Sequence, residues 1–283
     1  MNIDSYWEYS DPAASEARFR AALPQATADE RLELLTQIAR THSLRRQFGE
    51  AHALLDEVEP QLGGAGPAPR TRYLLERGRT LNSAGEKARA AGLFQQAWET
   101  ASAARLDGLA VDAAHMLAIV EPPASAAVWT ERGVELARGS TDPKARGLLP
   151  ALLNNHAWNL HDDARYDEAL LAFREAEVAW HASGRQPQGR IATWSVARCL
   201  RSLNRYEEAL QLQQRLEQEW QAAGEADGYV FEEIAENQEA LGRLEKATAY
   251  FRRAESELGK DPQFARENPA RLARITVLGR RSF

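Results

Sequence analysis

Apolar residues recur along this chain at three- and four-residue intervals, the spacing that places them on one face of an α-helix. No stretch alternates apolar and polar residues for long enough to predict a β-strand. The nearest candidates, GYVFEEI at 228–234 and RITVLG at 274–279, are short and lie in helical surroundings. Gly and Pro form clusters, such as GGAGPAP at 63–69, that divide the chain into helical stretches. The pattern therefore predicts an all-α protein.

Two of these stretches, forty residues apart, have closely similar sequences: RYDEALLAFREAEVAW at 165–180 and RYEEALQLQQRLEQEW at 205–220. Weaker copies of the same pattern occur elsewhere, each with a marker residue three positions before an Ala or other small residue. The six markers are Phe48, Lys87, Pro123, Tyr166, Tyr206 and Leu244. Their average spacing of roughly 39 residues fits one helix hairpin per unit. We therefore predict an α-solenoid of about six helix-turn-helix repeats.

Within each unit, the marker and the residues three, seven and ten positions after it share one helical face. Small residues at the third and tenth positions allow a neighbouring helix to approach closely. The seventh position is usually large and would fill the gap between hairpins: Leu55, Phe94, Thr130, Phe173, Gln213 and Phe251. Because one hairpin cannot bury this face alone, each unit needs a neighbour.

These residues resemble the tetratricopeptide (TPR) repeats. Gly-Arg-Leu-x-x-Ala at 242–247 and Arg-Tyr-x-Glu-Ala at 165–169 and 205–209 look like the family's turn and second-helix signature. A small residue also matches the family's first helix in each unit: Ala39, Gly78, Ala114, Ala157, Ala197 and Ala235. The period exceeds the common one of about 34 residues and is similar to that of kinesin light chains and bacterial regulator repeats. The resemblance implies a right-handed superhelix.

The chain length allows one elongated domain or two compact ones, and the repeats favour a single solenoid over residues 1–283. We expect an N-terminal cap at 1–27, six helical hairpins at 28–258 and a C-terminal cap at 259–283. One capping helix over 12–23 would turn Phe19 and Leu23 inward. The other, over 269–278, would leave the arginines of this region on a solvated face: Arg266, Arg271, Arg274, Arg280 and Arg281.

Composition narrows the classes of function. A formal net charge of −6 argues against a dedicated nucleic-acid binder. No apolar run is long enough to span a membrane, and the first residues lack the pattern of a secretory signal. With Cys199 as the single cysteine, neither a disulfide framework nor a multi-cysteine zinc site can form. We therefore expect a soluble, cytoplasmic protein.

Candidate catalytic chemistry is scarce. His156 and His161 would lie about 140° apart around a helix, so they would not face one metal ion. The sequence contains no HExxH motif, and GGAG at 63–66 lacks the Lys-Ser/Thr of a phosphate-binding loop. We expect no enzymatic activity, no metal and no cofactor.

The resemblance implies that the first helices line a concave groove. Transferred residue by residue, it places these side chains there: Arg79, Asn155, Trp158, His161, Trp194, Arg198 and Arg201. Glu232, Glu236 and Glu239 would form an acidic stripe at the C-terminal end. Large aromatics on an open helix face tend to be contact residues. We expect a scaffold that binds an extended peptide or a partner helix carrying acidic or carboxylate groups; the alternative is a peptide- or ligand-sensing regulator that acts on a separate effector.

Overall fold

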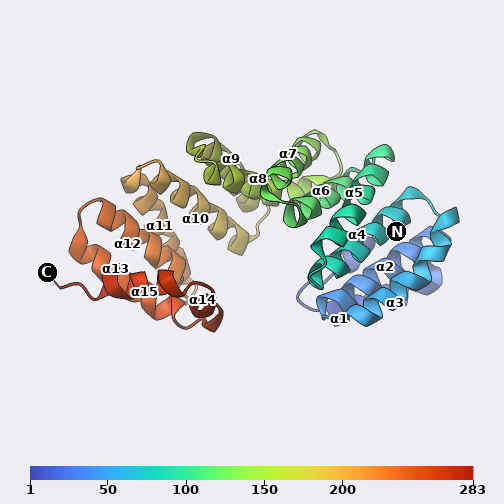
Figure 1. Cartoon of the computed structure of the whole chain (residues 1–283), viewed down its shortest axis with the longest axis horizontal. Helices are drawn as coiled ribbons and strands as arrows, with labels where there is room; N and C mark the ends of the chain where they lie inside the picture. The colour runs from blue at the N-terminus through green and yellow to red at the C-terminus, as the bar shows by residue number, and fades with distance from the viewer. Residues whose placement is uncertain (283) are drawn as a thin grey trace. The chain divides into compact units, whose positions relative to one another are not determined.

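The structure, a computed structural model, describes residues 1–282. It consists of fifteen α-helices joined by short turns and a few 3-10 segments, and no strand occurs among the described residues (Figure 1). The predicted all-α repeat fold is confirmed. The chain divides into two compact units, Met1–Leu152 and Leu153–Phe283, and the boundary falls inside helix α8 (Pro143–Asp162).

Unit 1 contains the N-terminal cap and the first three hairpins. Its elements are η1 (Ile3–Tyr6), α1 (Pro12–Ala22), η2 (Leu23–Gln25), α2 (Ala28–Leu44), α3 (Phe48–Val58), η3 (Glu59–Gly64), α4 (Pro67–Ser83), α5 (Lys87–Ala103), α6 (Asp107–Val120), α7 (Pro123–Gly139) and the first part of α8. Phe19 of α1 is fully buried against Leu34 and Ile38 of α2, so this helix packs on the first hairpin.

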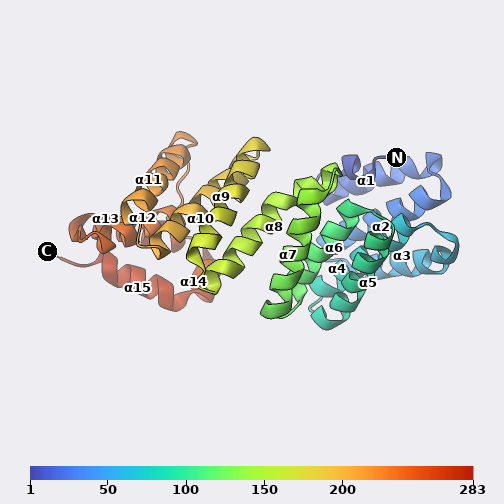
Figure 2. The ribbon, with the colours of Figure 1, turned by 90° about the horizontal axis from the view of Figure 1, so that it is seen from above.

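Unit 2 contains the second part of α8 and the remaining helices. These are α9 (Tyr166–Ala182), α10 (Gln186–Ser202), α11 (Tyr206–Ala222), α12 (Gly228–Ala240), α13 (Leu244–Leu258), α14 (Pro262–Glu267) and α15 (Pro269–Gly279). Consecutive helices from α9 to α13 pack against one another (Figure 2). Ile275 and Leu278 of α15 pack with Phe251 of α13 and cap this end of the unit.

Each predicted marker is the first residue of the second helix of a hairpin. The turn before it usually follows one pattern. The residue two positions before the marker has positive φ in five hairpins: Arg46, Gly85, Ala164, Asn204 and Gly242. The next residue then donates its N–H to a carbonyl five positions back, as Arg165 does to Leu160. This is the Schellman ending of a helix, and it reverses the chain at the same place in each unit. The third hairpin instead turns through Pro122 and Pro123, which explains its weak sequence match.

The predicted packing positions three, seven and ten residues after each marker are buried, whereas the markers themselves are half-buried or exposed. The small residues three after each marker and the residues seven after it are at most 9% exposed, including Phe94, Phe173 and Phe251 at 0%. Gly78 of α4 shows how tightly the pairs fit, because a Cβ at this residue would lie 2.5 Å from Cε1 of Phe94. No described helix is long and apolar enough to cross a bilayer.

The contact between Gly78 and Phe94 gives a prediction of stability. Gly78→Ala should lower the free energy of unfolding by about 1–3 kcal/mol, because the added methyl group overlaps a buried ring. The matched control is Gly92→Ala on α5, where a Cβ meets nothing within 4 Å. That change should raise stability by about 0.5–1 kcal/mol through the better helix propensity of Ala. Urea denaturation of both variants is the measurement, and equal effects would contradict the packing.

Candidate functional site

A row of aromatic rings crosses unit 2. Trp158 of α8, Trp194 of α10, Tyr229 of α12 and Phe264 of α14 lie in sequence, with centroid separations of 6.2, 6.5 and 5.7 Å between neighbours. The first three come from the first helices of successive hairpins, but they stand about eight, twelve and fifteen residues before their markers, so the packing of these helices brings them together and not an equivalent repeat position. We call these four residues the aromatic row. Phe264 is buried, whereas Tyr229 is 40% exposed and offers ring surface to a ligand.

The two tryptophans are half-buried rather than fully open. Trp158 packs edge-on against Phe173, with ring centroids 4.9 Å apart. Trp194 packs against the buried cluster that includes Leu210 and Val230, and its indole N–H donates to the carbonyl of Tyr229 at 3.4 Å. Each indole is therefore held in a fixed orientation while part of its surface remains accessible.

Trp194 also lines an apolar cavity of about 240 Å³ between α10, α11 and α12. Its lining residues are Arg190, Ile191, Trp194, Trp220, Asp227, Tyr229 and Val230. The Arg190 guanidinium lies 4.4 Å from the Trp220 ring centroid, a cation–π arrangement. Asp227 accepts hydrogen bonds from the backbone N–H groups of Tyr229 and Val230, and burial raises its pKa. A cavity with aromatic walls and few polar groups suits one apolar or aromatic side chain of a ligand.

Two arginines beside the aromatic row share one carboxylate. Glu233, only 3% exposed, accepts hydrogen bonds from Arg201 at 2.7 and 2.9 Å, and its nearest contact to Arg198 is 3.4 Å. Burial opposes the charge of Arg201, but Glu233, together with the charges of Glu236 and Glu232, raises that arginine's pKa. Burial, and then repulsion from Arg201, lower the pKa of Arg198. The charge of Arg198 is therefore the less compensated of the two.

Arg198 is connected to His161 through a hydroxyl group. Its Nη1 donates to Oγ of Ser202 at 2.7 Å, and that oxygen lies 2.9 Å from Nε2 of His161. The His161 ring is 5.2 Å from Trp158. Burial, followed by the charge of Arg198, lowers the histidine pKa. The structure thus brings together five of the predicted site residues: Trp158, His161, Trp194, Arg198 and Arg201.

The other two predicted residues differ in where they lie. Asn155 is half-buried on the part of α8 in unit 2. Arg79 belongs to unit 1, where it pairs with Glu76 at 2.7 Å and with Asp112. Burial opposes the charge of Arg79, but Asp112 and Glu76 together raise its pKa. Two carboxylates already balance this arginine.

The expected acidic stripe needs correction, because arginines of the C-terminal cap pair with it while their own side chains stay 36–52% exposed. Helix α15 packs along α13, and residues of the C-terminal cap pair with the glutamates of α12. The pairs are Arg271 with Glu232 at 2.6 Å, Arg274 with Glu236, and Arg281 with Glu239 at 2.8 Å. The glutamates are therefore neutralised rather than left to repel an acidic ligand.

Three residues that line the cavity were not predicted from the sequence as site residues: Arg190, Ile191 and Trp220. The repeat pattern could have pointed to Trp220, because this residue is the last of the repeated segment 205–220, as Trp180 is the last of the similar segment 165–180. Its partner Arg190 carries no such pattern. Among residues 1–282, no group of three or more His, Cys, Asp or Glu side chains is placed to hold a metal ion.

Known structures with the same arrangement of helices are numerous. The match to the apo form of RapI spans 92% of this chain and 76% of the RapI chain, with 13% sequence identity and a TM-score of 0.72. A tetratricopeptide repeat protein from Parabacteroides merdae covers 97% and 96%, with 15% identity and a TM-score of 0.52. The fold is that of the tetratricopeptide-like repeat proteins.

A third TPR-type structure contains a peptide. It is NprR, a quorum sensor from B. thuringiensis, in complex with its cognate peptide NprX. That complex covers 98% of this chain and 82% of its own, with 14% identity and a TM-score of 0.54. No protein-family model matches the sequence, and a search of curated proteins finds no match. At these identities the likeness establishes the TPR-type fold.

The unequal compensation of the two arginines predicts unequal effects on stability. Arg201→Gln should lower the free energy of unfolding by about 1–2 kcal/mol, because it removes the paired hydrogen bonds to a buried carboxylate. Arg198→Gln should change it by less than about 0.5 kcal/mol, since the relieved repulsion from Arg201 offsets the lost contact with Glu233 and the lost hydrogen bond to Ser202. Thermal and urea unfolding measure both. A larger loss for Arg198→Gln would show that Arg198 is the main partner of Glu233.

Proposed function

We propose that this protein binds an extended peptide on the face of unit 2 that carries the aromatic row, through an acidic side chain or free carboxylate of that peptide. The observation that carries the proposal is the incompletely compensated guanidinium of Arg198 beside half-exposed indole and phenol rings. Binding rather than catalysis is the proposed role, in the cytoplasm of a bacterial cell. The TPR-type fold of NprR, which holds a peptide, supports it by likeness of architecture.

The proposed contacts are of two kinds: charged hydrogen bonds to a carboxylate of the peptide and apolar contacts to one of its side chains. A peptide carboxylate would accept hydrogen bonds from Arg198, and Arg201 would add positive potential while staying bonded to Glu233. An apolar or aromatic side chain of the peptide would fill the cavity beside Trp194, Trp220 and Tyr229. Trp194 is already held by its hydrogen bond and packing, so little conformational entropy would be lost when it contacts the ligand.

The interaction would serve either a scaffold, which holds a partner protein by an extended segment, or a peptide-sensing regulator that acts on a separate effector. The small volume of the cavity favours recognition of one anchoring side chain, which both roles can use. Regulation would require the peptide to change the affinity for a second protein, and a scaffold would not.

Binding of synthetic peptides tests the proposal. Short peptides are made in free-acid and amidated form, with Glu or Gln at the acidic positions, and screened by fluorescence anisotropy. Trp194→Ala and Arg198→Gln should each weaken the best peptide by about 10- to 100-fold, the range of a hot-spot residue. Added salt should weaken binding to the parent more than to Arg198→Gln, because screening acts on the charged contact.

Matched controls separate local contact from general effects. Trp180→Ala removes a half-buried indole from α9, and Arg205→Gln removes an exposed arginine that pairs with Glu208. Both should bind the peptide within about twofold of the parent. If Trp194→Ala and Arg198→Gln bind as well as these controls do, the site lies elsewhere in the chain.

A further inference from the structure

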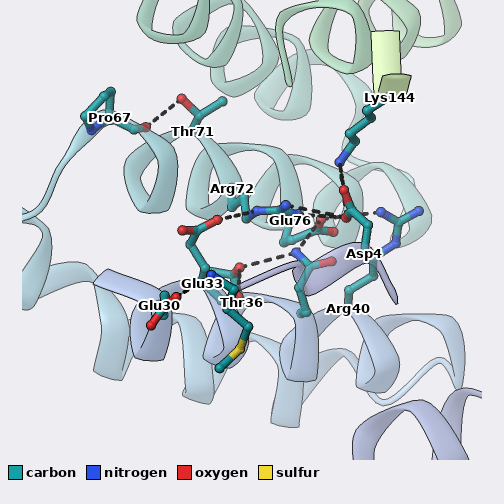
Figure 3. A network of polar contacts seen from close by, with 12 residues as sticks. Asp4, Glu30, Glu33, Thr36, Arg40, Pro67, Thr71, Arg72, Glu76 and Lys144 are labelled. Carbon is teal, nitrogen blue, oxygen red and sulfur yellow. Dashed lines mark hydrogen bonds and ion pairs between the residues drawn. The ribbon is translucent and has the colours of Figure 1, made fainter. Parts of the chain in front are cut away.

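The segment before α1 lies across the first helices of unit 1. We call residues 3–9 the N-terminal segment; apart from the single 3-10 turn Ile3–Tyr6, it is irregular. The carboxylate of Asp4 lies 3.3 Å from Arg72 of α4 and 3.3 Å from Lys144 of α8. Figure 3 shows Asp4 between these two cations. The segment therefore contacts two helices that are more than a whole repeat apart in sequence.

Apolar and aromatic contacts hold the same segment. Ile3 is 3% exposed and packs with Phe19, and the ring of Trp7 meets Phe19 edge-on at 5.1 Å. The Trp7 indole N–H donates to Oε1 of Gln37 on α2 at 3.0 Å. The Tyr9 ring stacks on Trp7 at 4.8 Å, and the Arg40 guanidinium lies 5.3 and 5.5 Å from the two ring centroids. An apolar anchor, a cation–π pair and a clamped carboxylate are typical contacts of a bound peptide.

The charges on this face need a carboxylate from the segment. Four cationic side chains form what we call the basic cluster: Arg40, Arg72, Arg79 and Lys144. The receiving helices supply three carboxylates to them, Glu33, Glu76 and Asp112. Asp4 is the fourth, so its removal would leave four positive charges facing three negative ones. Burial by itself would raise the pKa of Asp4, but Lys144 and Arg72 lower it, as expected of an anion in a basic site.

The centre of this face also contains a carboxylate oxygen that accepts no hydrogen bond from the described residues. Glu76 is 2% exposed, and its Oε1 accepts hydrogen bonds from Gln37, Arg40 and Arg79. Its Oε2 is equally buried and has no hydrogen-bond partner among the described residues. A buried carboxylate oxygen without a donor is costly. A ligand N–H that reached it would remove that cost, and the N-terminal segment does not supply one.

We propose that this face of unit 1 is a second peptide-binding site, specific for a carboxylate followed by aromatic residues, and that the N-terminal segment occupies it as an intramolecular ligand. Asp4 and Tyr9 remain 42% and 61% exposed, so the occupant is only partly enclosed. A tethered ligand competes at an effective concentration in the millimolar range. A free peptide of the same chemistry therefore binds weakly until the segment is displaced.

The test uses the full chain and a peptide of its own sequence. The probe is fluorescein-labelled MNIDSYWEYSDP, residues 1–12. In the protein, Asp4→Asn and Trp7→Ala are combined to weaken the tethered segment while Ile3 and the basic cluster are kept. The double variant should bind the probe at least tenfold more tightly than the parent chain, as measured by fluorescence anisotropy. Equal affinity for parent and double variant, or no binding to the double variant, overturns the proposal.

Two pairs of controls show whether binding uses the basic cluster. Asp4→Asn in the probe should weaken binding at least tenfold, whereas Asp11→Asn, which removes the same charge, should not. Adding Arg72→Gln to the double variant should abolish binding, whereas adding Arg89→Gln, at an exposed residue of α5 that pairs with Glu86, should leave it unchanged. If the members of either pair behave alike, the attraction is nonspecific and the proposed site is wrong. Thermal unfolding of each variant confirms that unit 1 remains folded.

Discussion

Every hairpin in this protein has an apolar face that it cannot bury by itself. The close approach of Phe94 to Gly78 is the clearest instance, since no larger residue than Gly fits under the ring. Because the same seam recurs at each marker, successive first helices present equivalent positions to the same side. In unit 2 this packing also brings Trp158, Trp194 and Tyr229 side by side from the first helices of three hairpins, at positions that are not equivalent in the repeat.

The same alignment brings charges from neighbouring repeats together. Arg72 meets Glu33 and Arg201 meets Glu233, in pairs 39 and 32 residues apart. Burying such pairs costs desolvation energy, so they contribute more to the register of the helices than to net stability. What distinguishes these arginines from one another is how much of their positive charge a carboxylate compensates. Arg198 shares Glu233 with Arg201, so its charge is the less compensated of the two, and this difference is the basis of the proposed carboxylate contact.

The two units use the corresponding surface in different ways. In unit 1 the N-terminal segment covers the basic cluster and supplies Asp4 as its fourth carboxylate. In unit 2 the aromatic row borders an open apolar cavity, and the C-terminal cap neutralises the glutamates of α12 without covering Trp194 or Ile191. One repeat architecture therefore provides one face that the N-terminal segment covers and one that carries an open apolar cavity. Both rely on the same chemistry of arginine, aromatic ring and carboxylate.

The helices, their pairing into hairpins and the residues buried between neighbouring helices could all be predicted from the amino-acid sequence. These features follow from local spacing: Tyr166 and Tyr206 begin their helices, and Ala169 and Ala209 are fully buried, because a 3.6-residue period fixes which side chains share a face. The sequence also placed Trp158 and Trp194 among the predicted groove residues of two successive first helices. The extent of the solenoid as one domain stays a prediction, and so does the set of ligand-contacting residues.

Only the tertiary structure decided which charges remain available. Arg79 looked like a groove residue in the sequence, and in the fold Glu76 and Asp112 hold it. Glu232 and Glu236 looked like an exposed stripe until α15 brought Arg271 and Arg274 to them. Asp4 meets Lys144 across 140 positions of the chain. Contacts between residues so far apart leave no periodic trace, because they depend on how whole helices pack and not on the spacing within any one of them.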